Sequence, residues 1–600
     1  MNSETKICQN CKNQFTIEPE DFEFYDKIKV PAPTFCPECR AIRRWSFRNE
    51  RSFYKRNCDL CKNSIISVHH NKTPFPVYCS DCWYSDKWDP MEYGWEYDFS
   101  KPFFQQNYEL QLRVPRLAII GRDNINSLYI NIGVFNKNCY LLIESANNED
   151  CFYGYWLENG CKNAVDSGFL TKVEIAYEAL FSWDSYKIFF SKDCKNCLNG
   201  VFLLNCVNVS DSFACVNLRN KQYTIFNVPY SKEEYNKKIK SYDLGSYQNL
   251  LRFKKEFFEF ILKFPRRFSY IINSSNVTGD YIVNSNKLTN AFYCENAENI
   301  KNGAHAFSNA KDLMDFDTIA LGAELCYESI NTGINVSKMK FCMRCWTGHS
   351  SEYSDNCDNI QSCFGSISLR NKQYCILNKQ YTKEEYEKLV PRIIQHMNEM
   401  PYVNKKGRVY KYGEFFPPEL SSFSYNETIA QEYFPLTKEQ AIKQGYSWKD
   451  PEERNIKIDL KTEDLPDHIK DVDDSILGKV IQCGHAPNYG SSTPIDCQEQ
   501  CATAFKIIEP ELEFYKKMNL PLPRLCPNCR HYQRLKQRNP LKLWKRQCQC
   551  AGEKSSNGVY QNTIQHSHGT ESCPNEFETT YSPDRPEIVY CEQCYQQEVV

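Results

Sequence analysis

Cysteine pairs with the spacing of metal ligands stand at both ends of this 600-residue chain. Near the N-terminus, four Cys-x-x-Cys knuckles follow one another within about 80 residues. Thiolate is the ligand that zinc favours in structural sites, and a gap of two residues lets both sulfurs of a knuckle reach one tetrahedral ion. The expected ligands of two zinc ions here are Cys8, Cys11, Cys36 and Cys39, then Cys58, Cys61, Cys79 and Cys82.

The segment from Cys11 to Cys58 recurs without a gap, 490 positions later, from Cys501 to Cys548. The recurring positions include the cysteines, a Phe-Tyr pair and several basic residues. The chain therefore contains one module at each end, an N-module (residues 1–90) and a C-module (residues 481–600).

The ligands of the C-module are less regular. Gln498 stands where Cys8 aligns, and Cys497 is the nearest substitute. Cys573 and Cys591 keep the separation of 18 positions found in the N-module, which favours them as ligands of the second site. The expected ligands are Cys497, Cys501, Cys526 and Cys529, then Cys548, Cys573, Cys591 and Cys594, and the alternatives are Cys483, His485, Cys550, His566 and His568.

The N-module contains Cys-x-x-Cys-x-x-x-Phe-x-Ile, then Phe-Tyr, then Pro-x-x-Cys-Pro-x-Cys-Arg. This order of residues resembles the "probable zinc-ribbon" family of small bacterial domains. The whole chain resembles long, uncharacterised zinc-ribbon proteins of candidate-phyla bacteria. The resemblance implies bound zinc and a ribbon fold, and it implies no reaction and no catalytic residue. With two sites per module, we expect four zinc ions per chain as cofactors.

The composition of the chain indicates the cellular compartment and the kinds of partner to expect. The net charge is −2, which does not predict a protein that binds nucleic acid over its whole surface. The first residues lack an apolar signal core, and no apolar run is long enough to cross a bilayer. So many thiols without a secretory signal indicate a reducing compartment. We expect a cytoplasmic protein with no membrane partner and no evident small-molecule substrate.

Between the modules, short β-prone segments alternate with Asn, Asp and Gly turns. Small apolar residues recur about every 12 positions, which is typical of a β-solenoid. A β-sandwich is the alternative, because it shows the same strands and turns without a fixed period. The recurring residues are Leu128, Cys139, Cys151, Ala164 and Cys197, then Leu288, Ile300, Leu313, Cys326 and Met339.

The middle of the chain is itself duplicated. The hexapeptide Leu-Arg-Asn-Lys-Gln-Tyr starts at Leu218 and again at Leu369, and a capping box follows each copy, at Ser231 and at Thr382. Each box predicts a helix that closes one open end of a solenoid. The expected fold is mainly β, with domains at 1–90 (zinc-ribbon module), 91–123 (aromatic connector), 124–268 and 269–402 (two solenoid repeats with capping helices), 403–480 (irregular and acidic connector) and 481–600 (zinc-ribbon module).

The middle also contains cysteines, and two pairs have metal-ligand spacing. These are Cys194-x-x-Cys197 and Cys342-x-x-Cys345. No second pair completes either site. A cysteine is a small hydrophobic side chain that stacks well in a narrow core, so we expect these thiols to lie in the core.

Basic residues keep their register in the two modules, and aromatic residues stand among them. Such a surface suits RNA, single-stranded DNA or an acidic protein face. The alternative is a charged face that pairs with the acidic connector at Glu452–Asp474. The expected partner-binding residues are Arg40, Arg44, Arg48, Arg530, Arg534 and Arg538.

Catalytic motifs are scarce in the sequence. It contains no glycine-rich phosphate loop and no His-Glu-x-x-His motif. Asp312, Asp315 and Asp317 form the one acidic cluster, and turn capping is a common role for such residues. We therefore expect a non-enzymatic zinc-binding scaffold or adaptor for a protein or nucleic-acid partner. The alternatives are an RNA- or single-stranded-DNA-binding protein that uses the basic segments, and a solenoid hydrolase of carbohydrates with zinc modules as caps.

Overall fold

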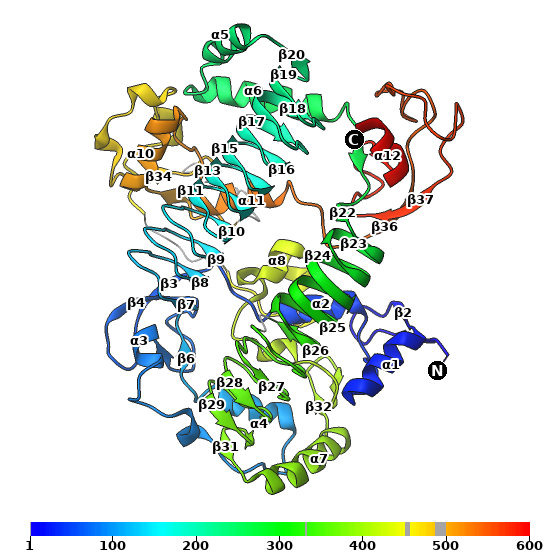
Figure 1. Ribbon diagram of the computed structural model, residues 1–600. Helices are drawn as coiled ribbons and strands as arrows, with labels where there is room; N and C mark the ends of the chain where they lie inside the picture. Colours follow the sequence, from blue (N-terminus) through cyan, green and yellow to red (C-terminus); the bar gives the residue numbers. More distant parts are fainter. Residues whose placement is uncertain (1, 331–332, 451–455, 486–499, 600) are drawn as a thin grey trace.

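The computed structural model describes residues 2–330, 333–450, 456–485 and 500–599. Within these ranges the protein is a strand-rich molecule with both helices and strands (Figure 1). Two stacks of parallel strands, mainly cyan and green in Figure 1, occupy the middle of the molecule. The cysteine-rich modules flank these stacks.

In the first stack, a strand pairs in parallel with the strand that lies 12 or 13 residues further along the chain, and one such repeat is called a coil here. β8 (Asn131–Val134) pairs with β9 (Ile143–Ala146), and β9 pairs with β10 (Tyr155–Glu158). Asn131 lies opposite Ile143, so one coil takes 12 residues. The other strands are β7 (Gly121–Arg122), β11 (Lys162–Val165), β12 (Gly168–Thr171), β13 (Glu174–Tyr177), β14 (Leu180–Trp183), β15 (Tyr186–Phe189), β16 (Lys192–Lys195), β17 (Leu198–Leu204), β18 (Ser210–Val216) and β19 (Gln222–Ile225).

The second stack repeats this arrangement in the green part of Figure 1. Its longer strands pair in parallel in chain order, with Leu313 opposite Cys326. The strands are β22 (Ile271–Ile272), β23 (Ser275–Val283), β24 (Asn286–Lys301), β25 (Ala304–Leu321), β26 (Glu324–Ile330), β27 (Gly348–His349), β28 (Asp358–Gln361) and β29 (Arg370–Gln373).

Left-handed backbone recurs at about every third residue of both stacks. In the first stack Asn205, Asn208, Asn217 and Asn220 have φ between 52° and 56°. Asparagine tolerates this conformation better than most residues. Asn205 Nδ2 donates to Asn217 Oδ1 at 2.8 Å, and Asn208 Nδ2 donates to Asn220 Oδ1 at 3.0 Å. The asparagine-rich turns of the sequence therefore form hydrogen-bonded ladders along the corners of the coils.

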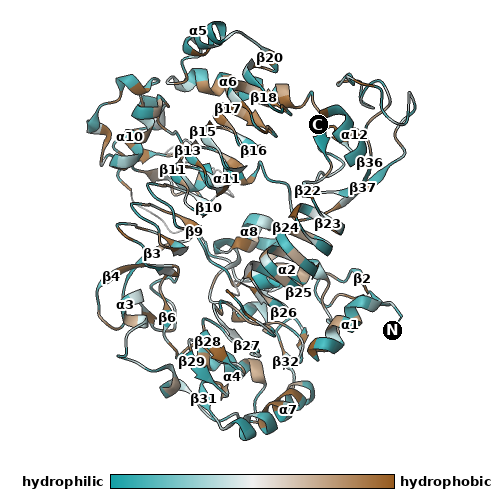
Figure 2. Ribbon diagram, in the orientation of Figure 1, coloured by the Kyte–Doolittle hydropathy of each residue, from teal (hydrophilic) through white to brown (hydrophobic). Residues whose placement is uncertain are grey.

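Small apolar side chains fill the interior of each stack, and hydrophobic residues (brown) lie along the strands in Figure 2. Cys194 and Cys197 are buried, and the Cys194 thiol donates to Lys192 O at 3.4 Å. The predicted core position of the middle cysteines is confirmed. Leu128 is different, because its side chain is 64% exposed. It precedes Cys139 by 11 residues instead of 12, and so falls outside the inward-facing register.

Helices follow both stacks where the capping boxes predicted them. α5 (Lys232–Tyr242) begins after Ser231, and α7 (Lys383–Glu399) begins after Thr382. In each, the N-cap hydroxyl accepts a hydrogen bond from the backbone N–H of the glutamate three residues later. α6 (Tyr247–Ile261) lies beside β17 at the end of the first stack (Figure 1).

Each module consists of short strand pairs and short helices. The first two helices of each module match with the same 490-residue offset as the sequence repeat. The N-module contains β1 (Glu4–Ile7), β2 (Gln14–Ile17), α1 (Pro19–Ile28), α2 (Pro37–Trp45), β3 (Tyr54–Asn57), β4 (Ser64–Ser67), β5 (Val77–Tyr78) and α3 (Ser80–Trp83). The C-module contains β34 (Ile481–Gln482), β35 (Ala504–Phe505), α10 (Glu509–Met518), α11 (Pro527–Leu535), β36 (Trp544–Gln547), β37 (Glu576–Thr579), β38 (Val589–Tyr590) and α12 (Glu592–Val599).

Each module contacts both stacks, and its central helix (α2 or α11) packs on the stack that is more distant from it in the sequence. α2 lies against β25 and β26 of the second stack, whereas α11 lies beside the first stack (Figure 1). β5 pairs in parallel with β6 (Arg116–Leu117), just before the first stack. β38 pairs in parallel with β21 (Arg266–Arg267), just before the second stack. Each module therefore joins the beginning of one stack to the side of the other.

Candidate metal centres

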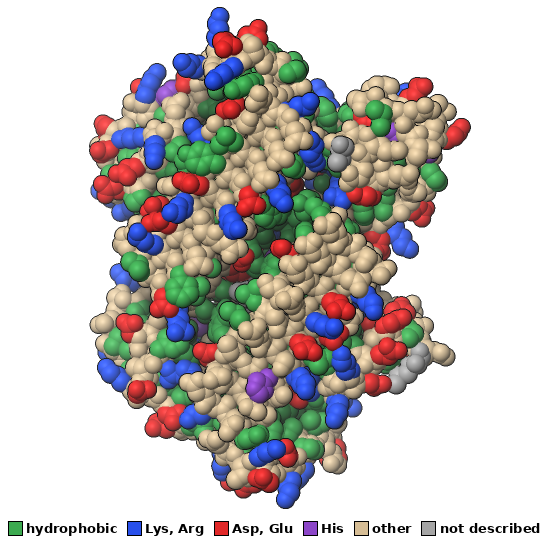
Figure 3. Space-filling model, viewed as in Figure 1, with side chains coloured by type: hydrophobic (Ala, Val, Ile, Leu, Met, Phe, Trp, Pro, Cys, Tyr) green, Lys and Arg blue, Asp and Glu red, His purple; other side chains and the backbone are tan. Residues whose placement is uncertain are grey.

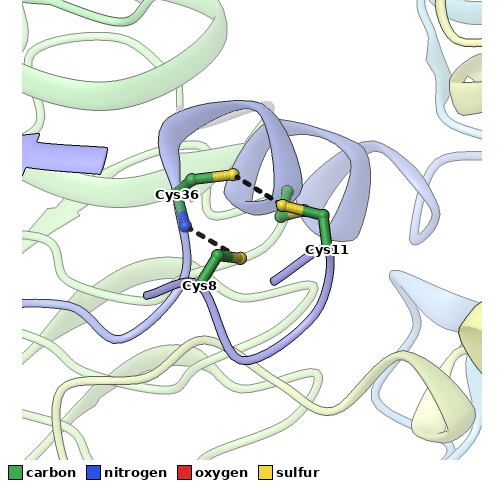
Figure 4. A group of neighbouring side chains, drawn as sticks. Cys8, Cys11 and Cys36 are labelled. Carbon is green, nitrogen blue, oxygen red and sulfur yellow. Dashed lines mark hydrogen bonds between the residues drawn. The ribbon is translucent and has the colours of Figure 1, made fainter. Parts of the chain in front are cut away.

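Site 1 (Cys8, Cys11, Cys36 and Cys39) forms between the β1–β2 turn and the start of α2, where Cys36 is the N-cap. Cys11 Sγ lies 3.7 Å from Cys36 Sγ, and the Cys36 N–H donates to Cys8 Sγ at 3.3 Å (Figure 4). All four sulfurs lie within 4.8 Å of one another. This spacing suits a tetrahedral metal ion with four thiolate ligands.

Site 2 (Cys58, Cys61, Cys79 and Cys82) repeats this geometry between the β3–β4 turn and the start of α3. Cys61 Sγ lies 3.9 Å from Cys79 Sγ, and the Cys79 N–H donates to Cys58 Sγ at 3.4 Å. Burial disfavours the Cys58 thiolate, but backbone N–H groups that donate to it bring its pKa down to about 7. The local backbone thus favours the form of the side chain that binds metal.

Site 3 consists of Cys483, Cys501, Cys526 and Cys529. Its first ligand was expected at Cys497, which lies outside the described residues. Cys483, one of the sequence-based alternatives, occupies the place instead: the Cys526 N–H donates to its sulfur at 3.1 Å. The reason is the strand pair β34–β35, which brings Cys483 beside the knuckle from a distant part of the chain. The other alternative, His485, does not belong to the group.

Site 4 consists of Cys548, Cys573, Cys591 and Cys594, the four residues expected for it. Cys573 Sγ lies 3.8 Å from Cys591 Sγ, and the Cys591 N–H donates to Cys548 Sγ at 3.2 Å. Beside it, Cys550, His566 and His568 group with Cys594. All four sites thus show the same bond from a helix-starting cysteine to the first sulfur, and each could bind a metal ion.

The arginines of α2 are buried against the second stack. Arg40 Nε and Nη2 lie 2.9 and 2.7 Å from Asp315 Oδ2, and Arg44 Nε lies 2.8 Å from Asp317 Oδ2. The side chains of Arg40 and Arg44 are at most 2% exposed. Burial alone would lower the pKa of Arg40, but Asp315 and nearby acidic groups hold it well above its usual value. Both arginines therefore stay charged in a closed ion-pair network.

The C-module makes the corresponding contact with the first stack. Arg534 Nη1 lies 2.8 Å from Asp166 Oδ1, and Arg530 Nη1 lies 2.5 Å from Asp166 Oδ2. Arg530 Nη1 also lies 3.2 Å from Glu511 Oε1 on α10. The Asp166 and Glu511 side chains are fully buried.

The third arginine of each module is buried too. Arg48 Nη2 lies 2.7 Å from Glu144 Oε1 and also contacts Glu50. Arg538 Nη1 donates to the Tyr433 hydroxyl at 2.6 Å.

The prediction that the six arginines bind an external partner is therefore wrong, because a buried side chain with an internal partner cannot meet an external phosphate. The residues concerned are Arg40, Arg44, Arg48, Arg530, Arg534 and Arg538. The partners that these arginines have within the described residues are carboxylates of the two stacks, the modules' own Glu50 and Glu511, and the Tyr433 hydroxyl. The alternative, pairing with the acidic connector, stays a prediction, because the connector begins outside the described residues.

The acidic cluster of the sequence forms the other half of this contact. Asp312 Oδ2 lies 2.7 Å from Lys27 Nζ, and Asp315 and Asp317 pair with the α2 arginines. These three carboxylates are occupied by the N-module. They are unavailable to a substrate, so they give no support to the hydrolase alternative.

A cleft of about 710 Å³ lies between the first stack, α6 and the C-module. In Figure 3, hydrophobic side chains gather in a hollow between the halves of the molecule. Basic residues outnumber acidic ones along the cleft. Arg266 is 8% exposed, and its Nη1 has no hydrogen-bond partner within the described part of the chain. The basic lining residues include Lys192, Lys254, Arg266, Arg267, Arg524 and Arg585, and the acidic ones are Glu178, Asp193, Asp280 and Glu587.

Among the described residues, no helix combines the length and apolar character needed to cross a membrane. The metal-ligand groups in these residues contain no cysteine of the stacks. No protein-family model matches this chain, and no curated protein matches it in sequence.

Proposed function

We propose that this protein is a non-enzymatic zinc-binding scaffold that binds an anionic partner. Sites 1 to 4 each offer four thiolates, which is the donor set of structural zinc. A catalytic zinc ion instead keeps one position open for water or substrate. We therefore assign one zinc ion to each site, and we take the two modules to be zinc ribbons, as the sequence resemblance implies.

The two stacks are β-solenoids in this proposal. Their strands pair in parallel across coils of 12 or 13 residues, and left-handed residues mark the corners. A β-sandwich would require antiparallel sheets that face each other. The fixed coil makes each stack a stiff rod, which suits a scaffold.

The proposal rests on one observation: each module contacts both stacks and so connects them. α2 joins the N-module to the second stack, and β5 joins the same module to the start of the first stack. The C-module makes the reciprocal contacts. Since metal binding supplies much of the folding free energy of small zinc modules, the zinc ions would fix the two solenoids relative to each other.

Metal analysis combined with small-angle X-ray scattering tests the scaffold. The purified chain should contain at least four zinc ions, and a chelator that removes them should increase its radius of gyration. Addition of zinc should reverse the change. A chain that binds two or fewer zinc ions, or that keeps its scattering profile after complete chelation, would overturn the proposal.

The cleft is the proposed site of the partner. Its excess of basic over acidic lining residues favours an anionic ligand. The aromatic ring of Phe258 also lines the cleft, and this residue is 50% exposed, so its ring would stack on a base. RNA or single-stranded DNA is therefore the anionic polymer that we favour.

Fluorescence anisotropy with a labelled single-stranded RNA and a labelled acidic peptide tests this site. We expect the RNA to bind with an affinity that falls as salt increases, and the combined substitution Lys192→Gln and Lys254→Gln, at two lysines that line the cleft, to weaken it about tenfold or more. The matched control is Lys237→Gln with Lys240→Gln, on the exposed face of α5. Equal loss in the control, or binding of the peptide alone, would contradict the assignment.

A further inference from the structure

A second group of metal ligands lies beside site 4 and shares one cysteine with it. Cys550 Sγ, one ring nitrogen each of His566 and His568, and Cys594 Sγ lie within 4.8 Å of one another, and Cys594 also belongs to site 4. We propose that the two groups form one binuclear zinc centre in which the Cys594 thiolate bridges both ions. This inference rests on zinc binding at site 4 and adds a fifth ion to the chain.

The first imidazole is oriented as a metal ligand. His566 Nδ1 lies 3.3 Å from Cys550 Sγ, and His566 Nε2 lies 3.0 Å from Glu598 Oε2. The side chains of His566 and Glu598 are both fully buried. A carboxylate that accepts the Nε2 proton leaves the Nδ1 lone pair free for a metal, which is the usual support of a zinc-bound histidine.

The second imidazole is fixed in the opposite tautomer. His568 Nδ1 lies 2.7 Å from the Glu571 carbonyl oxygen, and His568 Nε2 lies 3.4 Å from Cys594 Sγ. A carbonyl oxygen only accepts hydrogen bonds, so the proton resides on Nδ1. The Nε2 lone pair then faces the cluster. Both histidines thus present a free lone pair to the same point in space.

The sulfur of Cys550 accepts a hydrogen bond from a side chain that is itself fixed in place. The Asn562 side-chain amide donates to Cys550 Sγ at 3.2 Å, and the Tyr590 hydroxyl donates to Asn562 Oδ1 at 2.8 Å. The second bond fixes the amide with its NH₂ group toward the sulfur. Cys550 is 1% exposed, so this amide is a donor to a sulfur that lies in the interior.

The N-module lacks all three of these ligands. Leu60 stands where Cys550 aligns, and both histidines lie in an insertion between Cys548 and Cys573. The inserted residues 551–572 contain no helix and no named strand in the structure. Because a metal ion supplies folding free energy where a core is small, a second zinc ion would stabilise this insertion.

A shared thiolate also improves the charge balance of this buried site. One zinc ion with four thiolates carries two negative charges. Two zinc ions with five thiolates and two neutral imidazoles carry one negative charge. Since burial disfavours net charge, the binuclear centre is the better arrangement in the interior of the C-module.

Metal stoichiometry of the full chain is the first test. We expect five zinc ions, and four in the variant His566→Ala with His568→Ala. The variant His568→Cys, which keeps a ligand, should retain five. His349→Ala, which changes an exposed histidine of the second stack, is the matched control and should also retain five. Four ions in the unchanged chain, with no further loss in the double variant, would overturn the inference while leaving the scaffold proposal intact.

Cobalt substitution tests the bridge itself. In the fully substituted chain, two cobalt ions that share a thiolate should couple magnetically, so the electron paramagnetic resonance signal should account for fewer spins than the cobalt content. The His566→Ala, His568→Ala variant should restore one spin system per cobalt ion. Five ions without magnetic coupling would mean separate sites and would contradict the bridge. A chain with no metal at sites 1 to 4 would instead refute the scaffold proposal.

Discussion

Arg40 and Asp315 lie 275 positions apart in the chain, and Arg40 Nη2 lies 2.7 Å from Asp315 Oδ2 in the interior. The pair is one half of a repeated contact. Arg530 pairs with Asp166 in the same way on the other side of the molecule. The two aspartates also share left-handed backbone, with φ of 52° and 50°.

Aromatic residues accompany both ion pairs. The Tyr25 ring contacts the Tyr327 ring edge to face, with centroids 5.5 Å apart. The Tyr515 ring contacts the Tyr177 ring in the same way at 5.7 Å. Both modules therefore use equivalent residues on equivalent coils. The protein is a duplicated unit whose modules have docked on the opposite copy of the stack.

We expect Asp315→Ala to destabilise the protein by about 3–5 kcal/mol, because it leaves Arg40 and Arg44 buried without their shared carboxylate. Asp166→Ala should have a similar effect through Arg530 and Arg534. Chemical denaturation measures both free energies of unfolding.

The control for this prediction is an exposed ion pair on the second stack. Lys311 Nζ lies 3.0 Å from Glu298 Oε2, and both side chains are about half exposed. Glu298→Ala should cost at most about 1 kcal/mol. If Asp315→Ala costs no more than this control, the buried contact does not hold the module in place.

Loss of the metal at site 1 should destabilise the second stack as well as the N-module. On the sequence alone, Cys36→Ser would unfold a small zinc module by itself. In the structure the module shares one apolar core with Tyr327, Phe341 and Tyr353 of the second stack. We expect hydrogen exchange to accelerate in Cys36→Ser both in the module and across residues 311–345. The first stack, around residues 192–216, is the internal control and should keep its protection.

The cysteines should divide into two reactivity classes. Cys11 and Cys61 are exposed, whereas Cys194 and Cys342 are completely buried. After chelation in the absence of denaturant, alkylation followed by mass spectrometry should label the first pair within minutes and leave the second pair unlabelled. Rapid labelling of Cys194 under these conditions would mean that the stacks open readily.

Glu158 should make the stability depend on pH. Burial, together with the negative charge of Glu295 from the second stack, raises the pKa of Glu158 from 4.5 to about 7. A raised folded-state pKa means that the stabilising contribution is complete below pH 4.5 and is lost as the pH rises to about 7. We expect Glu158→Gln to flatten this part of the stability profile in thermal denaturation. A profile that is unchanged by the substitution would exclude Glu158 as its source.

Local patterns of the sequence determined much of the candidate sites and of the coil. The Cys-x-x-Cys spacing identified the ligands of sites 1 and 2 and the pair Cys591 and Cys594 of site 4, because two sulfurs that are three positions apart reach one point through local backbone geometry alone. The capping boxes at Ser231 and Thr382 marked the starts of two helices for the same reason. The Asn-rich turns and the 12-residue period indicated the coils, since each coil repeats a local conformation.

Features that depend on contacts between distant parts of the chain became defined only in the tertiary structure. Cys483 became a ligand because β34 pairs with β35, and no local spacing encodes that contact. The arginines of α2 and α11 were misassigned because an arginine has the same pattern in the sequence whether it faces solvent or a buried carboxylate. Arg40 found Asp315 through the docking of a module on the second stack. That docking is set by the summed burial of many side chains, which becomes defined only when the chain has folded.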